Sequence, residues 1–180
     1  MDAIYALKNR RSVRKFKDEV VPRSVMEEVI ELVRFAPSWA NSQTARWTLI
    51  DCPETIQKLA NDAVKGFVYN METLKNAKGV AILSFVRGKS GKLEKYNIES
   101  ADTNKWEIFD AGIAAQTFCL SCFAHGVATC VFGVIDETTI GEIIGLPEEE
   151  TVAALFVYGY AETQPDAPAR KERGDILRFL

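Results

Sequence analysis

Two short basic stretches lie near opposite ends of the chain, and their side chains could bind a phosphate. The first is residues 10–16 (RRSVRKF) and the second is residues 170–173 (RKER). Arginine offers planar, bidentate donors that match the oxygens of a phosphate monoester, and Ser12 adds a hydroxyl between two arginines. Like charges repel, so a fold that gathered these residues would need an anion to neutralise them. On charge alone, a solvated basic edge remains the favoured interpretation.

A polar, proline-marked turn lies between the two basic stretches, at residues 36–43 (APSWANSQ). Its amide and hydroxyl groups offer the donors and acceptors needed by a heteroaromatic ring edge with N–H, C=O and bare nitrogen positions, such as that of a flavin. Trp39, Phe123 and Phe132 could supply stacking walls for such a ring. The sequence therefore predicts a site for a phosphorylated aromatic cofactor.

The remaining reactive residues argue against catalysis by side chains. His125 is the single histidine, and it directly precedes Gly126 at an expected helix end. Cys119 and Cys122 form a C-x-x-C inside a helical pattern, which favours buried packing over a metal or dithiol site. No carboxylate pair suited to acid–base work and no Walker or Rossmann fingerprint is present. Chemistry carried by a cofactor, with no metal, fits this set.

Length and composition predict one domain, residues 1–180. The chain is 47% hydrophobic and 26% charged, with a net charge of −3, so nothing favours nucleic acid or an anionic membrane surface. The N-terminus meets charge too early for an apolar signal region, and no apolar run approaches membrane-spanning length. A cytoplasmic location is expected, and four cysteines suit a reducing compartment.

Hydrophobic periodicity, caps and breakers predict helices alternating with a few buried strands. The expected helices are residues 2–9, 22–36, 53–66, 67–77, 104–125 and 136–144, with Pro37 ending the second. The expected strands are residues 47–50, 79–86, 127–134 and 151–158. This pattern indicates an α+β or three-layer α/β domain.

Two further segments are expected to lie outside the core. Residues 87–103 are polar and rich in lysine, which predicts a mobile surface loop that could act as a lid. Residues 161–173 are polar and contain two prolines, whereas residues 176–180 are apolar again. A tail that ends in apolar residues suggests packing on a partner subunit.

The chain resembles the FMN-dependent nitroreductase family over essentially its full length. The matching motifs are residues 10–16, 36–43, 110–116 (DAGIAAQ), 126–133 (GVATCVFG) and 159–161 (GYA), followed by Arg170-Lys171. The resemblance implies a three-layer α/β/α fold, with a central, mostly antiparallel sheet flanked by helices. It also implies a homodimer with exchanged C-terminal tails and two FMN sites at the interface.

The resemblance assigns the predicted FMN contacts to four groups. The phosphate and ribityl chain would be held by Arg10, Arg11, Ser12 and Arg14. The phosphate site would be closed by Arg170, with Lys171 as a helper. Beneath the ring, the partner subunit would contribute Pro37, Ser38, Trp39 and Asn41, with Gln43 as an additional contact. The flavin edge would be followed by Cys130, Val131, Phe132 and Gly133, with a backbone N–H near N5. The walls on the substrate side would be Trp39 and Phe123.

The implied activity is transfer of a hydride from NAD(P)H to flavin N5, followed by reduction of a nitroaromatic, quinone or similar acceptor in a ping-pong order. NADH and NADPH are not distinguished. Two alternatives stay open: a reductive dehalogenase or flavin-fragmenting enzyme, which Lys89, Lys92 and Lys95 would favour, and a flavin-binding sensor without turnover. The chain departs from the family at Thr44, where proline is usual, and this change is expected to loosen the loop after Gln43.

Overall fold

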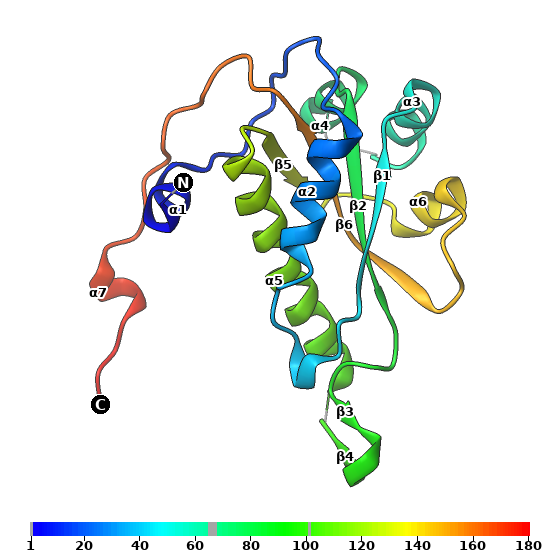
Figure 1. Ribbon diagram of the computed structural model, residues 1–180, viewed down its shortest axis with the longest axis vertical. Helices are drawn as coiled ribbons and strands as arrows, with labels where there is room; N and C mark the ends of the chain where they lie inside the picture. The colour runs from blue at the N-terminus through cyan, green and yellow to red at the C-terminus, as the bar shows by residue number, and fades with distance from the viewer. Residues whose placement is uncertain (1, 65–67, 101) are drawn as a thin grey trace.

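A four-stranded antiparallel sheet forms the middle layer of the computed structural model, which describes residues 2–64, 68–100 and 102–180 (Figure 1). Its strands are β1 (Ala45–Ile50), β2 (Gly79–Val86), β5 (Ala128–Phe132) and β6 (Glu150–Gly159), and they lie in the order β1-β2-β6-β5. All three pairings are antiparallel. The continuous apolar run of β2 is explained by its central place, since residues 79–85 are all buried.

One face of the sheet is covered by α2 (Arg23–Val33) and the long α5 (Thr103–Ala124). Met26 and Val29 of α2 and Phe118 of α5 are buried against this face, in one cluster with Phe156 of β6. The Phe118 ring also stacks on Trp47 of β1, with a centroid distance of 4.3 Å. Aliphatic side chains of α2 and the Phe118 ring of α5 therefore join these two helices to the sheet.

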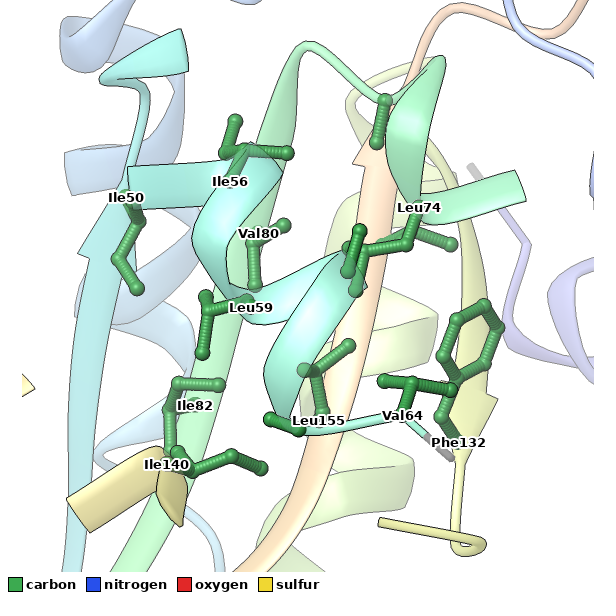
Figure 2. Close-up of a cluster of buried hydrophobic side chains, with 14 of the residues drawn as sticks. Ile50, Ile56, Leu59, Val64, Leu74, Val80, Ile82, Phe132, Ile140 and Leu155 are labelled. Carbon is green, nitrogen blue, oxygen red and sulfur yellow. The ribbon is translucent and has the colours of Figure 1, made fainter. Parts of the chain in front are cut away.

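The other face is covered by α3 (Pro53–Asp62), α4 (Val68–Lys75) and α6 (Glu137–Ile144). Figure 2 shows Leu59 of α3, Leu74 of α4 and Ile140 of α6 in the cluster packed over the strands. The Asp136 carboxylate caps α6 by accepting the Thr139 N–H at 3.0 Å. The predicted α+β fold, with helices on both sides of an antiparallel sheet, is confirmed.

The N-terminal helix and the C-terminal tail lie beside each other, outside the three layers (Figure 1). The short α1 (Ala3–Asn9) contacts the C-terminal half of α5, and the tail leaves β6 and runs past α1 (Figure 1). The Gln164 side chain donates to the Asn9 carbonyl at 3.0 Å. Beyond it the tail carries only α7 (Arg173–Ile176), and every residue from 162 to 180 is exposed.

The structure corrects the predicted end of one helix and the predicted loop at residues 87–103. Helix α2 ends at Val33 rather than at Pro37, because Phe35 and Ala36 form i→i+3 turn bonds and a residue before proline disfavours helix. Residues 87–103 contain a small hairpin, β3 (Lys92–Leu93) and β4 (Ile98–Glu99), joined by the 3₁₀ turn η2 (Glu94–Tyr96). The predicted cap Gly66 lies outside the described residues. Among the described helices, none is both long and apolar enough to cross a membrane.

Candidate cofactor site

The first basic stretch runs beside β5 as an extra, irregular strand. The Val13 N–H donates to the Thr129 carbonyl at 3.0 Å, and Ser12 forms a parallel bridge with Thr129. Val13 is buried, at 2% exposure, whereas Ser12 and Arg14 are exposed. The alternation of an extended chain thus buries the apolar residue and leaves its polar neighbours accessible.

Among the described residues, the arginines of this stretch have no acidic partner. In the part of the chain that the structure describes, no carboxylate lies within ion-pair distance of Arg10, Arg11 or Arg14. Arg11 donates to the carbonyls of Lys8 and Arg10, at 2.8 and 2.9 Å. A group of cationic donors without a counter-charge fits a phosphate monoester, which accepts several charge-assisted hydrogen bonds.

The predicted flavin-edge residues lie beside these arginines. Cys130 and Phe132 are buried on β5, while Val131 between them is 45% exposed and Gly133 follows the strand. Burial raises the pKa of the Cys130 thiol, and the positive charges of Arg14 and, more weakly, Arg10 oppose that rise. Both cations therefore act on this strand. The structure brings the basic stretch and the β5 stretch together, as the sequence predicted for one site.

The turn after α2 adopts an unusual backbone. It contains the 3₁₀ helix η1 (Trp39–Asn41), and the Ser38 hydroxyl accepts the Gln43 N–H at 2.9 Å. Ala40, Asn41 and Gln43 all have left-handed φ, at 46°, 56° and 49°. Such a conformation costs a residue with a side chain on the order of 1 kcal/mol and is concentrated at functional sites.

Asp110 holds this turn in place. Its carboxylate accepts the Trp39 N–H at 3.0 and 3.1 Å, the Ser42 hydroxyl at 3.1 Å and the Ser90 hydroxyl at 2.7 Å. The residue is 3% exposed. Sequence reasoning placed Asp110 only inside a matching motif and gave it no role. The signal was a carboxylate among small apolar residues of α5, where an acid needs hydrogen-bond donors.

Two cavities flank the turn. One, of about 310 Å³, lies between α2, β1 and α5, and is lined by Val33, Pro37, Trp47 and Asp110 among others. Within the described structure, the buried Thr44 Oγ1 and Trp47 Nε1 have no hydrogen-bond partner. The other cavity, of about 340 Å³, lies on the opposite side of the turn, toward the β2–β3 connection.

Thr44, where the sequence departs from the family, follows the turn directly, and its effect on the looseness of the loop stays a prediction. Its carbonyl accepts the Val86 N–H at 3.1 Å, so the residue continues the pairing of β1 with β2. Thr44 is also buried, at 2% exposure. A backbone hydrogen bond to the central strand therefore anchors the end of the turn, whatever side chain stands there.

The turn and the basic stretch lie at opposite ends of α5 within one chain. Asp110, which holds the turn, and Ala124, which precedes β5, are about 21 Å apart at a helical rise of about 1.5 Å per residue. Trp39 packs near Trp106, with a centroid distance of 6.3 Å, whereas Phe123 stacks on Tyr5 at 6.2 Å. The two predicted substrate walls, Trp39 and Phe123, are therefore not neighbours within one subunit.

Among the described residues, no hydrogen bond or ion pair joins the second basic stretch to the first. Arg170 and Lys171 lie in the exposed tail, and the contact between the tail and the N-terminal segment is made upstream, by Gln164. Residues 10–14 are brought together with residues 130–133, whereas residues 37–43 lie at the other end of α5 in the same chain. The closing of the phosphate site by Arg170 and Lys171 stays a prediction.

The histidine and the cysteines of α5 have structural surroundings. His125 Nδ1 lies 2.8 Å from the Ser121 carbonyl at the helix end. Cys119 and Cys122 are buried free thiols, and burial raises the pKa of both. No cluster of potential metal ligands occurs in the described ranges. Cys119 and Cys122 pack in the same core cluster as Phe118, and their burial disfavours the thiolate form.

Known proteins resemble this chain over most of its length, in sequence and in fold. The profile of the Nitroreductase family matches residues 7–160. YdgI of Bacillus subtilis, provisionally named an NAD(P)H nitroreductase, is 26% identical and aligns over 87% of this chain and 86% of its own. The nitroreductase NfnB of Mycolicibacterium smegmatis is 25% identical over 87% and 81%. A protein of Exiguobacterium sibiricum, solved in complex with FMN and provisionally called a nitroreductase, superimposes with a TM-score of 0.87 at 20% identity, over 100% and 98%.

Proposed function

The chain belongs to the nitroreductase family, and we propose that it is an FMN-dependent oxidoreductase acting on small acceptors. It would take electrons from NAD(P)H and deliver them to nitroaromatic, quinone or related molecules. Bound FMN would supply the two-electron chemistry, which amino-acid side chains lack. The observation that carries the proposal is the cluster of cationic donors beside β5, which has no carboxylate partner among the described residues.

The residues of this chain divide the work of holding the cofactor. Arg10, Arg11, Ser12 and Arg14 would bind the phosphate and ribityl chain. Cys130, Val131, Phe132 and Gly133 would follow the ring edge, because β5 lies directly beside the basic stretch. Pro37, Ser38, Trp39, Asn41 and Gln43 would pack under the ring of the partner subunit's cofactor. Arg170 and Lys171 would close the phosphate site from the tail.

A homodimer would unite the parts that one chain keeps apart. The turn held by Asp110 and the basic stretch lie at opposite ends of α5, so a single subunit cannot place both around one ring. The α5 surface beside the turn carries exposed Ile108 and Phe109, at 53% and 57%. The tail also ends in exposed apolar residues, which would pack on the partner.

The protein's part in the reaction would be orientation and exclusion of water. Asp110 and Ser38 accept the N–H groups of Trp39 and Gln43, and these hydrogen bonds would hold the left-handed turn in place for a ligand. Backbone N–H groups near residues 130–133 would stabilise charge on the ring edge. Nicotinamide and acceptor would occupy the same face in turn, in a ping-pong order, and no side chain need donate a proton.

The first test is cofactor binding. We expect the purified protein to show flavin absorbance, or to bind FMN with quenching of its fluorescence. Arg10→Gln should weaken FMN at least about tenfold, the size of a lost hydrogen bond to a charged group. Lys58→Gln, an exposed change on α3, is the matched control. A protein that cannot be reconstituted with FMN would contradict the proposal.

The second test is turnover. NADH and NADPH oxidation should be followed with menadione and nitrofurazone as acceptors. Parallel lines in double-reciprocal plots are expected for a ping-pong order. A protein that holds FMN but oxidises neither nucleotide would be a flavin-binding sensor, and selective turnover of halogenated aromatics would indicate a dehalogenase.

A further inference from the structure

We propose that the cavity between the η1 turn and the β2–β3 connection binds the electron acceptor, and that this acceptor is a small planar molecule with an anionic group. The cavity has a volume of about 340 Å³, enough for a single-ring compound. Trp39 and Gln43 line one side, and Lys89 and Lys92 line the other. The inference rests on the proposed function, since the η1 turn is the part that would lie beside the flavin ring.

The two walls of the cavity are joined through α5. Asp110 accepts the Trp39 N–H from one wall at 3.0 Å and the Ser90 hydroxyl from the other at 2.7 Å. One helical turn earlier, the Glu107 carboxylate accepts the Gly88 N–H. Ser90 is fully buried, and Asp110 and Glu107 are 3% and 5% exposed. A pocket with both walls tied to buried groups is preorganised for a ligand.

The cavity is lined by positive charge. Arg46, Lys89 and Lys92 contribute to its surface, and no acidic side chain of the described residues does. Lys92 is already paired, with its ammonium 2.9 Å from the Glu99 carboxylate. The Arg46 guanidinium donates to the carbonyls of Gln43 and Ala45, at 2.9 Å each, and neither of these partners carries a counter-charge.

Lys89 is the cation best placed to meet a ligand. It is exposed, and it has no ion-pair partner among the described residues. The two buried carboxylates of α5 that bind this connection, Glu107 and Asp110, are occupied by the Gly88 N–H and the Ser90 hydroxyl. A cavity lined by both an ammonium and an indole suits a molecule that combines a planar ring with a carboxylate.

Equilibrium binding gives a test that does not depend on turnover. The FMN-loaded, full-length protein should be titrated with benzoate and with benzamide, its neutral isostere, by calorimetry. We expect benzoate to bind at least about tenfold more tightly than benzamide. Lys89→Gln should remove about tenfold of benzoate affinity and change benzamide affinity by less than about twofold. Lys58→Gln, with the same change in net charge, should alter neither.

Turnover should show the same preference for an anionic acceptor over its neutral counterpart. The ratio of kcat/KM for 4-nitrobenzoate to that for 4-nitrobenzamide should fall about tenfold in Lys89→Gln, and should fall in wild type as salt is raised. Equal binding of benzoate and benzamide by wild type, or equal losses for both in Lys89→Gln, would overturn the inference. If flavin absorbance and menadione reduction persist in that case, the proposed function stands and only the acceptor class is wrong. A wild-type protein that lacks both flavin absorbance and menadione reduction would contradict the proposed function.

Discussion

The Asp110 carboxylate accepts the backbone N–H of Trp39, 71 positions earlier in the chain, at 3.0 Å. This buried charge is balanced by neutral donors from two different loops rather than by a cation. Hydrogen bonds to a charged group are stronger than those between neutral groups, and a buried carboxylate without them would be costly. Through Asp110, helix α5 thus holds the turn that follows α2.

Removing this carboxylate should destabilise the fold. Asp110→Ala leaves the Trp39 N–H and the hydroxyls of Ser42 and Ser90 without their acceptor. We expect a loss of about 2–4 kcal/mol in the free energy of unfolding, measured by urea denaturation. Asp62→Ala, at the exposed end of α3, should change it by less than about 0.5 kcal/mol. Equal effects in the two variants would show that the hydrogen bonds contribute little.

The left-handed turn should tolerate glycine better than alanine at its first strained position. Ala40 is exposed and has φ 46° and ψ 30°. Ala40→Gly should raise the free energy of unfolding by about 0.5 kcal/mol, because relief of backbone strain outweighs the added freedom of the unfolded chain. Ala124→Gly, at the end of α5, should lower it by about 0.5–1 kcal/mol. A change of the same sign in the free energy of unfolding of both variants would show that Ala40 is not strained.

The end of the tail should matter for assembly and not for the fold of one subunit. Phe179 is 88% exposed, so nothing in its own chain buries it. If the tail packs on a partner, Phe179→Asp should shift the protein toward monomer in sedimentation velocity while far-UV circular dichroism stays unchanged. Thr163→Asp, in the polar part of the tail, is the control. A Phe179→Asp variant that sediments like wild type would rule out this docking.

An ion pair predicts a defined pH dependence of stability. Arg23 and Asp51 form two hydrogen bonds, at 2.6 and 2.8 Å, which link the start of α2 to the end of β1. The hydrogen bond from Arg23 lowers the pKa of Asp51 below 3.8. A lowered carboxyl pKa contributes stability above the unfolded value, and that contribution is lost as pH falls through the folded value.

Asp51→Asn should therefore cost about 0.5 kcal/mol at pH 7, a modest amount because Arg23 is solvent-exposed. The difference from wild type should shrink between pH 5 and pH 3 in urea unfolding curves. Asp166→Asn in the exposed tail should match wild type throughout. A difference that grows on acidification would have the wrong sign for this pair.

The elements of the fold could be predicted from sequence because their signals are local. The apolar run of β2 and the Asp136 cap of α6 each depend on residues close together in the chain. Boundaries were less certain where turns compete with helix, as at Val33. The hairpin within residues 87–103 was missed because its strands have only two residues each.

For the site, too, local sequence signals could be predicted and long-range contacts could not. The sequence by itself determined which residue types could bind a phosphate and a ring, since arginines, a serine and a polar turn carry that chemistry wherever they lie. Only the tertiary structure decided that residues 12–14 pair beside Thr129 while the turn is held by Asp110 at the other end of α5. Such contacts join positions far apart in the chain. They depend on how helices pack against the sheet, and no local pattern encodes that packing.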